Sequence, residues 1–139
     1  MLDHLGLDVS DYDRSKAFYA KALAPLGIEL LMEPIPTVGG FGHAGMPYFW
    51  IGHRGRQAQT GVHVAFKAES RGKVDAFHAA ALDAGATDNG GPGMREIYHP
   101  NYYGAFVLDP DGNNVEAVCH TVDAPAPDPR AAPGPNRLG

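Results

Sequence analysis

The chain contains two copies of one sequence module, and this repeat restricts the fold more than any other feature. HLGLDVSDYDRSKAFYAKALAPLG from His4 and HVAFKAESRGKVDAFHAAALDAG from His63 align without gaps. Both begin with His, carry Ala-Phe at the same offset, and reach a Gly within one residue of each other. Agreement of His, Phe and Gly in one register indicates two structurally equivalent units.

Each copy is predicted to fold as β-α-β-β-β, which makes the chain an α+β protein. Apolar residues alternate with His, small or polar residues after both His4 and His63, as in a half-buried strand. A helix then follows, capped in the first copy by Ser10 with Asp13, and stopped by Gly27 or Gly85. The further strands are expected at Ile28–Met32, Gly40–His43, Tyr48–Gly52, Met94–Tyr98, Tyr102–Leu108 and Asn114–His120, with a DPDGN turn between the last two.

We expect one domain over residues 1–120, with module one at 1–57 and module two at 58–120. Residues 121–139 are rich in Pro and Ala and are predicted to be a linker or a surface arm. The 16 Asp and Glu outnumber the 11 Lys and Arg, and no basic block occurs, so no nucleic-acid partner is expected. No apolar run suits a bilayer and no leader pattern occurs, so we expect no membrane association and a cytoplasmic location.

Seven histidines against one cysteine suggest metal binding or acid–base chemistry, and a lone cysteine excludes thiolate clusters and an internal disulfide. His4 and His63 begin equivalent strands, so a pseudo-twofold pairing of the modules would bring them face to face. Glu116 lies in the apolar run NVEAV, where a carboxylate needs an ion, a hydrogen bond or a metal. Two imidazoles and one carboxylate suit an octahedral divalent ion with three open positions. A buried salt bridge among the same residues is the alternative.

The opening DHLGLDVSDYDRSKAFY, the second-module GVHVAF and the closing DPDGNNVEAV resemble the vicinal oxygen chelate superfamily, over about residues 1–120. That superfamily includes glyoxalases, bleomycin resistance proteins and extradiol dioxygenases. The resemblance implies a curved sheet around a central cavity, which holds a divalent metal (Fe, Mn, Ni or Zn). It also implies that the metal ligands fall on His4, His63 and Glu116.

One departure from the family pattern concerns the fourth strand, where glyoxalase I-like members carry a second Glu. This chain has Tyr48-Phe49-Trp50-Ile51-Gly52-His53 there, so the four-ligand glyoxalase site is incomplete. His53 is a weak substitute because it lies at the strand end. Phe49 and Trp50 are candidate substrate-binding walls of the cavity, with core packing as an equal alternative.

His99 and Tyr103 are the candidate catalytic residues, since their segment precedes the seventh strand near the implied cavity mouth. A turn with an aromatic plug is the alternative. The run Gly40–Gly45 matches GxGxxG, but a strand follows it where dinucleotide binding needs a helix, so we interpret it as a loop.

The leading functional hypothesis is a metal-dependent enzyme, of lyase, isomerase or dioxygenase type, acting on a small oxygen-bearing substrate. The rival hypothesis is a metal-free protein that sequesters an antibiotic or another small molecule. The resemblance also implies a homodimer, in which modules are sometimes exchanged so that each site uses both chains.

Overall fold

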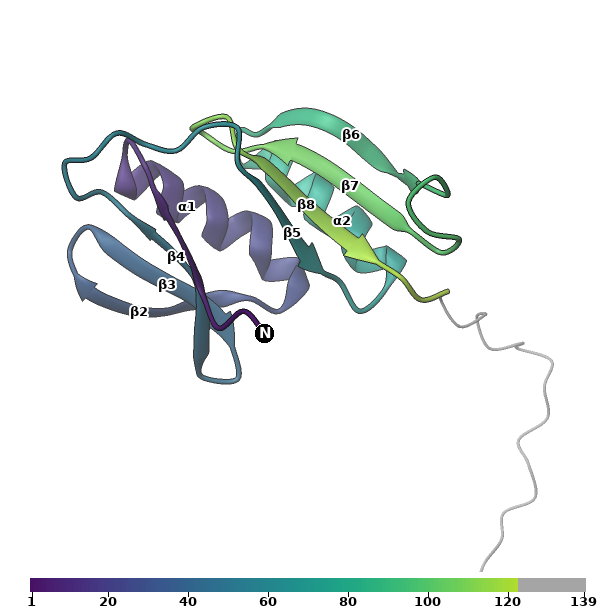
Figure 1. Cartoon of the computed structure of the whole chain (residues 1–139), viewed down its shortest axis with the longest axis horizontal. Helices are drawn as coiled ribbons and strands as arrows, with labels where there is room; N and C mark the ends of the chain where they lie inside the picture. Colours follow the sequence, from purple (N-terminus) through teal and green to yellow (C-terminus); the bar gives the residue numbers. More distant parts are fainter. Residues whose placement is uncertain (123–139) are drawn as a thin grey trace, which may run out of the picture.

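The computed structural model describes residues 1–122 and contains the two predicted modules in sequence (Figure 1). Each module is a βαβββ unit, as the repeat predicts. Module one contains β1 Leu5–Asp8, α1 Tyr12–Leu23, the 3-10 turn η1 Ala24–Leu26, β2 Glu29–Ile35, β3 Val38–His43 and β4 Met46–Gly52. Module two contains β5 His63–Lys67, α2 Arg71–Asp83, β6 Thr87–Met94, β7 Tyr103–Leu108 and β8 Asn114–Cys119. Residues 123–139, most of the predicted Pro/Ala-rich tail, lie outside the described residues.

The strands form two separate four-stranded sheets of the same topology. Sheet 1 has the order β1-β4-β3-β2, and sheet 2 has the order β5-β8-β7-β6. In each sheet the strand that comes first in the sequence (β1 or β5) pairs in parallel with the strand that comes last (β4 or β8). The other neighbouring strands pair antiparallel. The two sheets are not joined into the single curved sheet that the resemblance implies, so β1 and β5 are both sheet edges.

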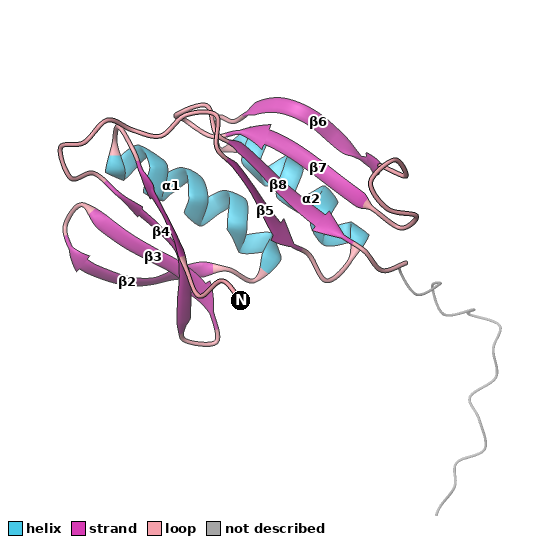
Figure 2. Ribbon diagram, in the orientation of Figure 1, coloured by secondary structure: helices cyan, strands magenta, loops and turns pink. Residues whose placement is uncertain are grey.

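Both helices lie behind the strands in the view of Figure 2, and they contact each other there. Phe49 of sheet 1 and Phe66 of sheet 2 meet in this layer with ring centroids 5.2 Å apart, so one core serves both modules. We call the face of each sheet that is turned away from α1 and α2 its open face. Neither helix covers the open faces.

The DPDGN turn between β7 and β8 fastens module two to module one. The Tyr19 hydroxyl on α1 donates a 2.5 Å hydrogen bond to the buried Asp109 carboxylate. The Ser10 hydroxyl donates to Asp111 of the same turn. The turn motif is therefore both the predicted hairpin connection and a contact between modules.

Several local predictions need correction. Ser10 is not the N-cap of α1, because its hydroxyl donates to Asp111. The N-cap is Asp11, whose side chain accepts a hydrogen bond from the Arg14 amide. The predicted strand Met94–Tyr98 is wrong, because β6 lies earlier and ends at Met94. The strand predicted at Gly40–His43 is confirmed as part of β3, whereas the interpretation of the whole run Gly40–Gly45 as a loop is wrong, because only Ala44 and Gly45 form the turn.

Among residues 1–122, neither helix combines the length and the apolar character needed to cross a bilayer.

Candidate functional site

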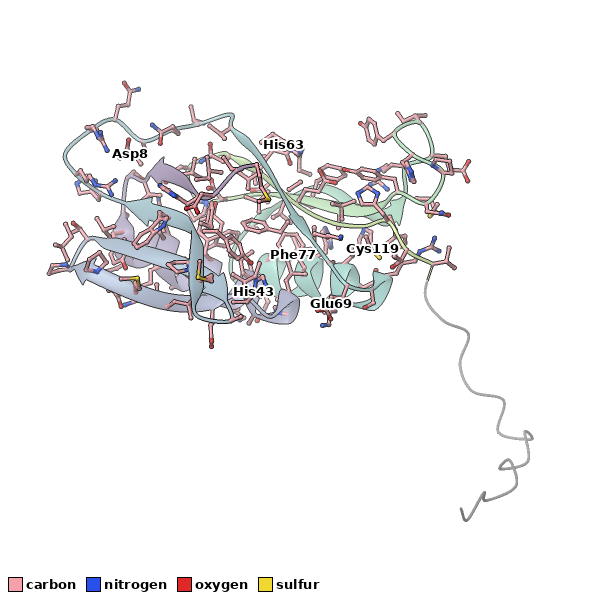
Figure 3. The ribbon with its side chains drawn as sticks, turned by 60° about the horizontal axis from the view of Figure 1, so that its bottom comes forward. Asp8, His43, His63, Glu69, Phe77 and Cys119 are labelled. Atoms are coloured by element: carbon pink, nitrogen blue, oxygen red, sulfur yellow. The ribbon has the colours of Figure 1, made fainter. Side chains whose placement is uncertain are left out.

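His63 is placed on the open face of sheet 2 by strand alternation. It begins β5, whose Val64 and Phe66 are buried in the core on the helix side. Residues one position away from them must point the other way. The His63 side chain is 50% exposed, so its imidazole is accessible from the open face (Figure 3).

Glu116 lies in the middle of β8 on the same open face, beside His63. Its Oε1 atom is 3.0 Å from Nε2 of His63, and its side chain is only 1% exposed. Gly104 on the neighbouring strand makes room for the carboxylate, since a Cβ there would lie 3.1 Å from Oε2. A buried carboxylate is costly unless it is hydrogen-bonded or paired, and here it is both.

Tyr102 supplies the second partner of Glu116, because its hydroxyl donates to Oε2. Burial raises the pKa of the Tyr102 phenol, and the hydrogen bond to the negative Glu116 carboxylate raises it further. The phenol therefore stays protonated at neutral pH and acts as a hydrogen-bond donor. The two Glu116 oxygens are thus divided between an imidazole and a phenol.

Sequence reasoning selected Tyr103 and missed Tyr102. Phe106 pairs with Glu116 across β7 and β8, so residues an even number of positions away from Phe106 share its face. Tyr102 does so, whereas the Tyr103 hydroxyl donates a 2.6 Å hydrogen bond to Asp75 of α2 on the helix side. Strand parity from Glu116 was the signal that could have identified Tyr102.

A pocket of about 440 Å³ opens over these groups. Its lining residues are His63, Tyr98, Tyr102, Phe106, Asn114 and Glu116. The Phe106 ring stacks on the His63 imidazole, with centroids 6.2 Å apart and an interplanar angle of 24°. His99 lies next to this pocket without lining it: its ring is 5.4 Å from that of His120, and its Nδ1 accepts from the Asn101 amide. The pocket combines aromatic walls with a few convergent polar groups, as small-molecule sites do.

His4 does not join His63 and Glu116 within one chain. It precedes β1, is 62% exposed, and lies 2.7 Å from Asp3. Its neighbours Leu2 and Leu5 line a groove of about 590 Å³ together with residues 64–69. At the other end of β1, the Asp8 carbonyl accepts a hydrogen bond from the Gln59 amide, shortly before β5 begins at His63. His4 and His63 are therefore at opposite ends of the seam between the two sheets.

Phe49 and Trp50 point to opposite faces of sheet 1. Phe49 is buried in the core, where its ring contacts Tyr19 and Phe66. Trp50, the next residue along β4, is partly buried and lies on the open face. Nδ1 of His53 donates a 3.1 Å hydrogen bond to the Val9 carbonyl, so His53 is engaged in holding the end of β4.

The donor set of one chain is smaller than a three-ligand metal site. Within residues 1–122, no group of three or more His, Cys, Asp or Glu side chains is arranged to hold an ion. His63 and Glu116 provide one nitrogen and one oxygen donor at 3.0 Å, a pair of the kind that binds divalent transition metals. A three-ligand site would need one more donor than residues 1–122 bring together.

The chain is therefore a paired-module protein. It has two βαβββ modules whose sheets share one topology, and a carboxylate–imidazole pair on the open face of one sheet. The sequence model of the Glyoxalase/Bleomycin resistance protein/Dioxygenase superfamily matches residues 1–117. The chain belongs to this superfamily.

Solved structures agree with this assignment. A glyoxalase/bleomycin resistance protein from Albidiferax ferrireducens is 31% identical with a TM-score of 0.73, and the match covers 86% of this chain and 98% of that one. A glyoxalase/bleomycin resistance protein/dioxygenase family enzyme from Burkholderia phytofirmans is 20% identical, with a TM-score of 0.67 and coverage of 86% and 98%. A lactoylglutathione lyase from Agrobacterium tumefaciens is 19% identical, with a TM-score of 0.62 and coverage of 86% and 92%. The last two show similarity of fold alone. Comparison with curated protein sequences gave no match.

Proposed function

We propose that this protein is a divalent-metal-dependent enzyme that acts on a small oxygen-bearing substrate, by chemistry of the lyase, isomerase or dioxygenase type. The observation that carries the proposal is the Glu116 carboxylate, buried to 1% exposure and 3.0 Å from a half-exposed imidazole at the base of a pocket. His63 and Glu116 are the two ligands from one chain. His4 of a second copy is the third.

The second copy is needed because His4 lies away from His63 in the same chain, at the other end of the seam. Both open faces lack a helical cover, and β1 and β5 are unpaired edges. In a twofold dimer, sheet 1 of each chain can pair with sheet 2 of the other, and the same contact then forms twice. Since His4 and His63 are equivalent positions of the repeat, such pairing brings them to equivalent places in one site.

The residues around the pair have separable tasks. Tyr102 donates to Glu116 Oε2 and so leaves Oε1 directed towards His63. Phe106 holds the imidazole plane by stacking. A divalent ion bound there would act as a Lewis acid on substrate oxygens. Proton transfer is assigned to the Tyr98–Tyr103 segment, in which Tyr98 and Tyr102 line the pocket and His99 lies next to it. Tyr103, the other residue singled out by the sequence, has its hydroxyl on the helix side with Asp75 and is a poorer candidate for this task.

A metal-free, sequestering protein is the second candidate function. Two observations favour it: only two donors meet among residues 1–122, and Trp50 stands where a fourth ligand would otherwise be expected. Such a protein would use the open faces as binding walls and would not need His4.

Metal content separates the two candidates. Elemental analysis of the purified full chain is expected to find a stoichiometric divalent metal, which Glu116→Gln and His4→Ala both remove. Glu69→Gln is the matched control, because its side chain is 83% exposed and pairs with Lys73 on the surface. Absence of metal from the wild type, together with unchanged small-molecule binding by His4→Ala, would favour the sequestering protein.

A further inference from the structure

The strand register reveals a row of residues across each open face, and the two rows differ in chemistry. In sheet 2 the row is Ala65–Glu116–Phe106–Gly90. The corresponding row of sheet 1 is Gly6–Trp50–Gly40–Met32. The rows are equivalent because Gly6 and Ala65 each lie two residues after the repeat histidine. Trp50 therefore occupies the repeat position of Glu116.

The Trp50 ring lies flat on the backbone of Gly40. A Cβ at Gly40 would be 2.8 Å from Cη2 of the indole and 2.9 Å from both Cζ2 and Cζ3. Near-equal distances to three consecutive ring carbons place the face of the ring, and not its edge, over Gly40. Only a glycine at this position lets the indole approach so closely.

The neighbours of Trp50 in its row either lack a side chain or are exposed. Gly6 and Gly40 flank Trp50 without side chains, and Met32 at the end of the row is 48% exposed. Within the described part of the chain, Trp50 takes part in no ring or cation–π contact. The row contains no titratable group. We call Gly6, Trp50, Gly40 and Met32 the indole shelf.

We infer that the indole shelf is the specificity-determining surface of the site and takes a flat aromatic ring of the substrate. The inference rests on the proposed function, in which sheet 1 of one chain faces the His63–Glu116 pair of the other. Offset stacking on an indole favours planar rings, and the Met32 thioether provides a further contact that aromatic rings favour. The repeat has thus replaced a second carboxylate by a ring-binding surface, so substrate oxygens are held on one side and the ring on the other.

Calorimetric titration of the full chain with 2-naphthoate and with decahydro-2-naphthoate tests the shelf. The two probes share a carboxylate and a carbon skeleton, but only the first is flat. We expect the wild type to bind 2-naphthoate about twofold to tenfold more tightly. Trp50→Leu should remove this preference, and Trp50→Phe should retain part of it.

Gly40→Ala is the second variant, because it keeps the tryptophan and displaces the ring from the backbone. It should reduce the preference and also shift the emission of Trp50, which is the only tryptophan in the chain. Met46→Leu is the control on the same sheet, because Met46 is 64% exposed, begins β4 and lies outside the indole shelf, and it should leave the preference in place. No preference in the wild type, or a preference that Trp50→Leu retains in full, would overturn the inference.

Glu116→Gln separates this inference from the proposed function. Loss of metal in Glu116→Gln with an unchanged ring preference is expected if both are right. A wild type without metal, whose ring preference still depends on Trp50, would reject the enzyme and keep the shelf. A metal-binding wild type whose ring preference survives Trp50→Leu would reject the shelf alone.

Discussion

Nε2 of His63 lies 3.0 Å from Oε1 of Glu116, and the two side chains differ sharply in exposure, at 50% and 1%. The carboxylate is thus held by the protein, while the imidazole remains open to a ligand. The pairing comes from neighbouring parallel strands, in which Glu116 is in register with Ala65, two residues after His63.

His63→Ala is expected to lower the free energy of unfolding by roughly 1–3 kcal/mol, because it removes the imidazole that lies 3.0 Å from a buried carboxylate oxygen. His63→Ala in a Glu116→Gln background should lower the free energy of unfolding by less, because the amide carries no charge that would be left without a partner. Urea denaturation of the wild type, both single variants and the double variant measures this coupling. Strictly additive effects would show that the two side chains do not interact in solution.

Tyr102→Phe is expected to cost roughly 1–3 kcal/mol, because Oε2 of the buried Glu116 loses its donor. Tyr98→Phe is the matched control: Tyr98 is 63% exposed, and loss of its hydroxyl should change the free energy of unfolding by less than about 0.5 kcal/mol. Chemical denaturation compares the two. Equal costs would mean that the phenol–carboxylate hydrogen bond adds nothing to stability.

Asp8 links β1 to the connection between the modules. Its carboxylate should make the stability of the fold depend on pH. The hydrogen bond from Gln59 lowers the pKa of Asp8 below its ordinary value of 3.8, with Arg56 and Arg54 acting in the same direction against partial desolvation. A lowered folded-state pKa gives stability that is present above pH 3.8 and is lost as the pH falls through the folded-state value. The melting temperature of the wild type should exceed that of Asp8→Asn at neutral pH. The difference should close in acid, and a difference independent of pH would contradict this account.

Tyr19→Phe tests the contact between modules. Asp109 keeps its hydrogen bonds from the Asp111 and Asn113 amides when the Tyr19 hydroxyl is removed. We therefore expect the turn to persist and stability to fall by about 1.5–3 kcal/mol, as for a lost hydrogen bond to a charged group. Hydrogen exchange should show faster exchange of the Asp111 and Asn113 amides. Unchanged exchange with unchanged stability would mean that the turn does not fasten the modules.

Much of the fold could be predicted from local pattern. The repeat gave two βαβββ modules, and period-two alternation placed His63 on the face opposite Val64 and Phe66. β6 was missed because Thr87–Met94 has the sequence TDNGGPGM, whose Gly and Pro are typical of turns. Antiparallel pairing with β7 makes it a strand, and that pairing is not local.

The candidate site was predicted only in part for a related reason. Glu116 stood out because a carboxylate in an apolar strand demands a partner, and His63 is that partner. The position of His4 depends on how the two modules pack through α1 and α2, which the repeat does not encode. Tyr102 and the selected Tyr103 are adjacent in the sequence, and adjacent residues of a strand point to opposite faces of the sheet.

The central claim is that His4 of one chain and His63 with Glu116 of another form one site. Metal content of a mixed dimer tests it most directly. His4→Ala and His63→Ala chains, carrying different tags and expressed together, are purified through both tags. A twofold dimer with shared sites contains one doubly altered site and one intact site.

The account predicts that each single variant alone is nearly free of metal, and that the mixed dimer recovers about half of the wild-type content per dimer. A mixed dimer as poor in metal as its two parents, formed from a wild type that does hold metal, would contradict the shared site.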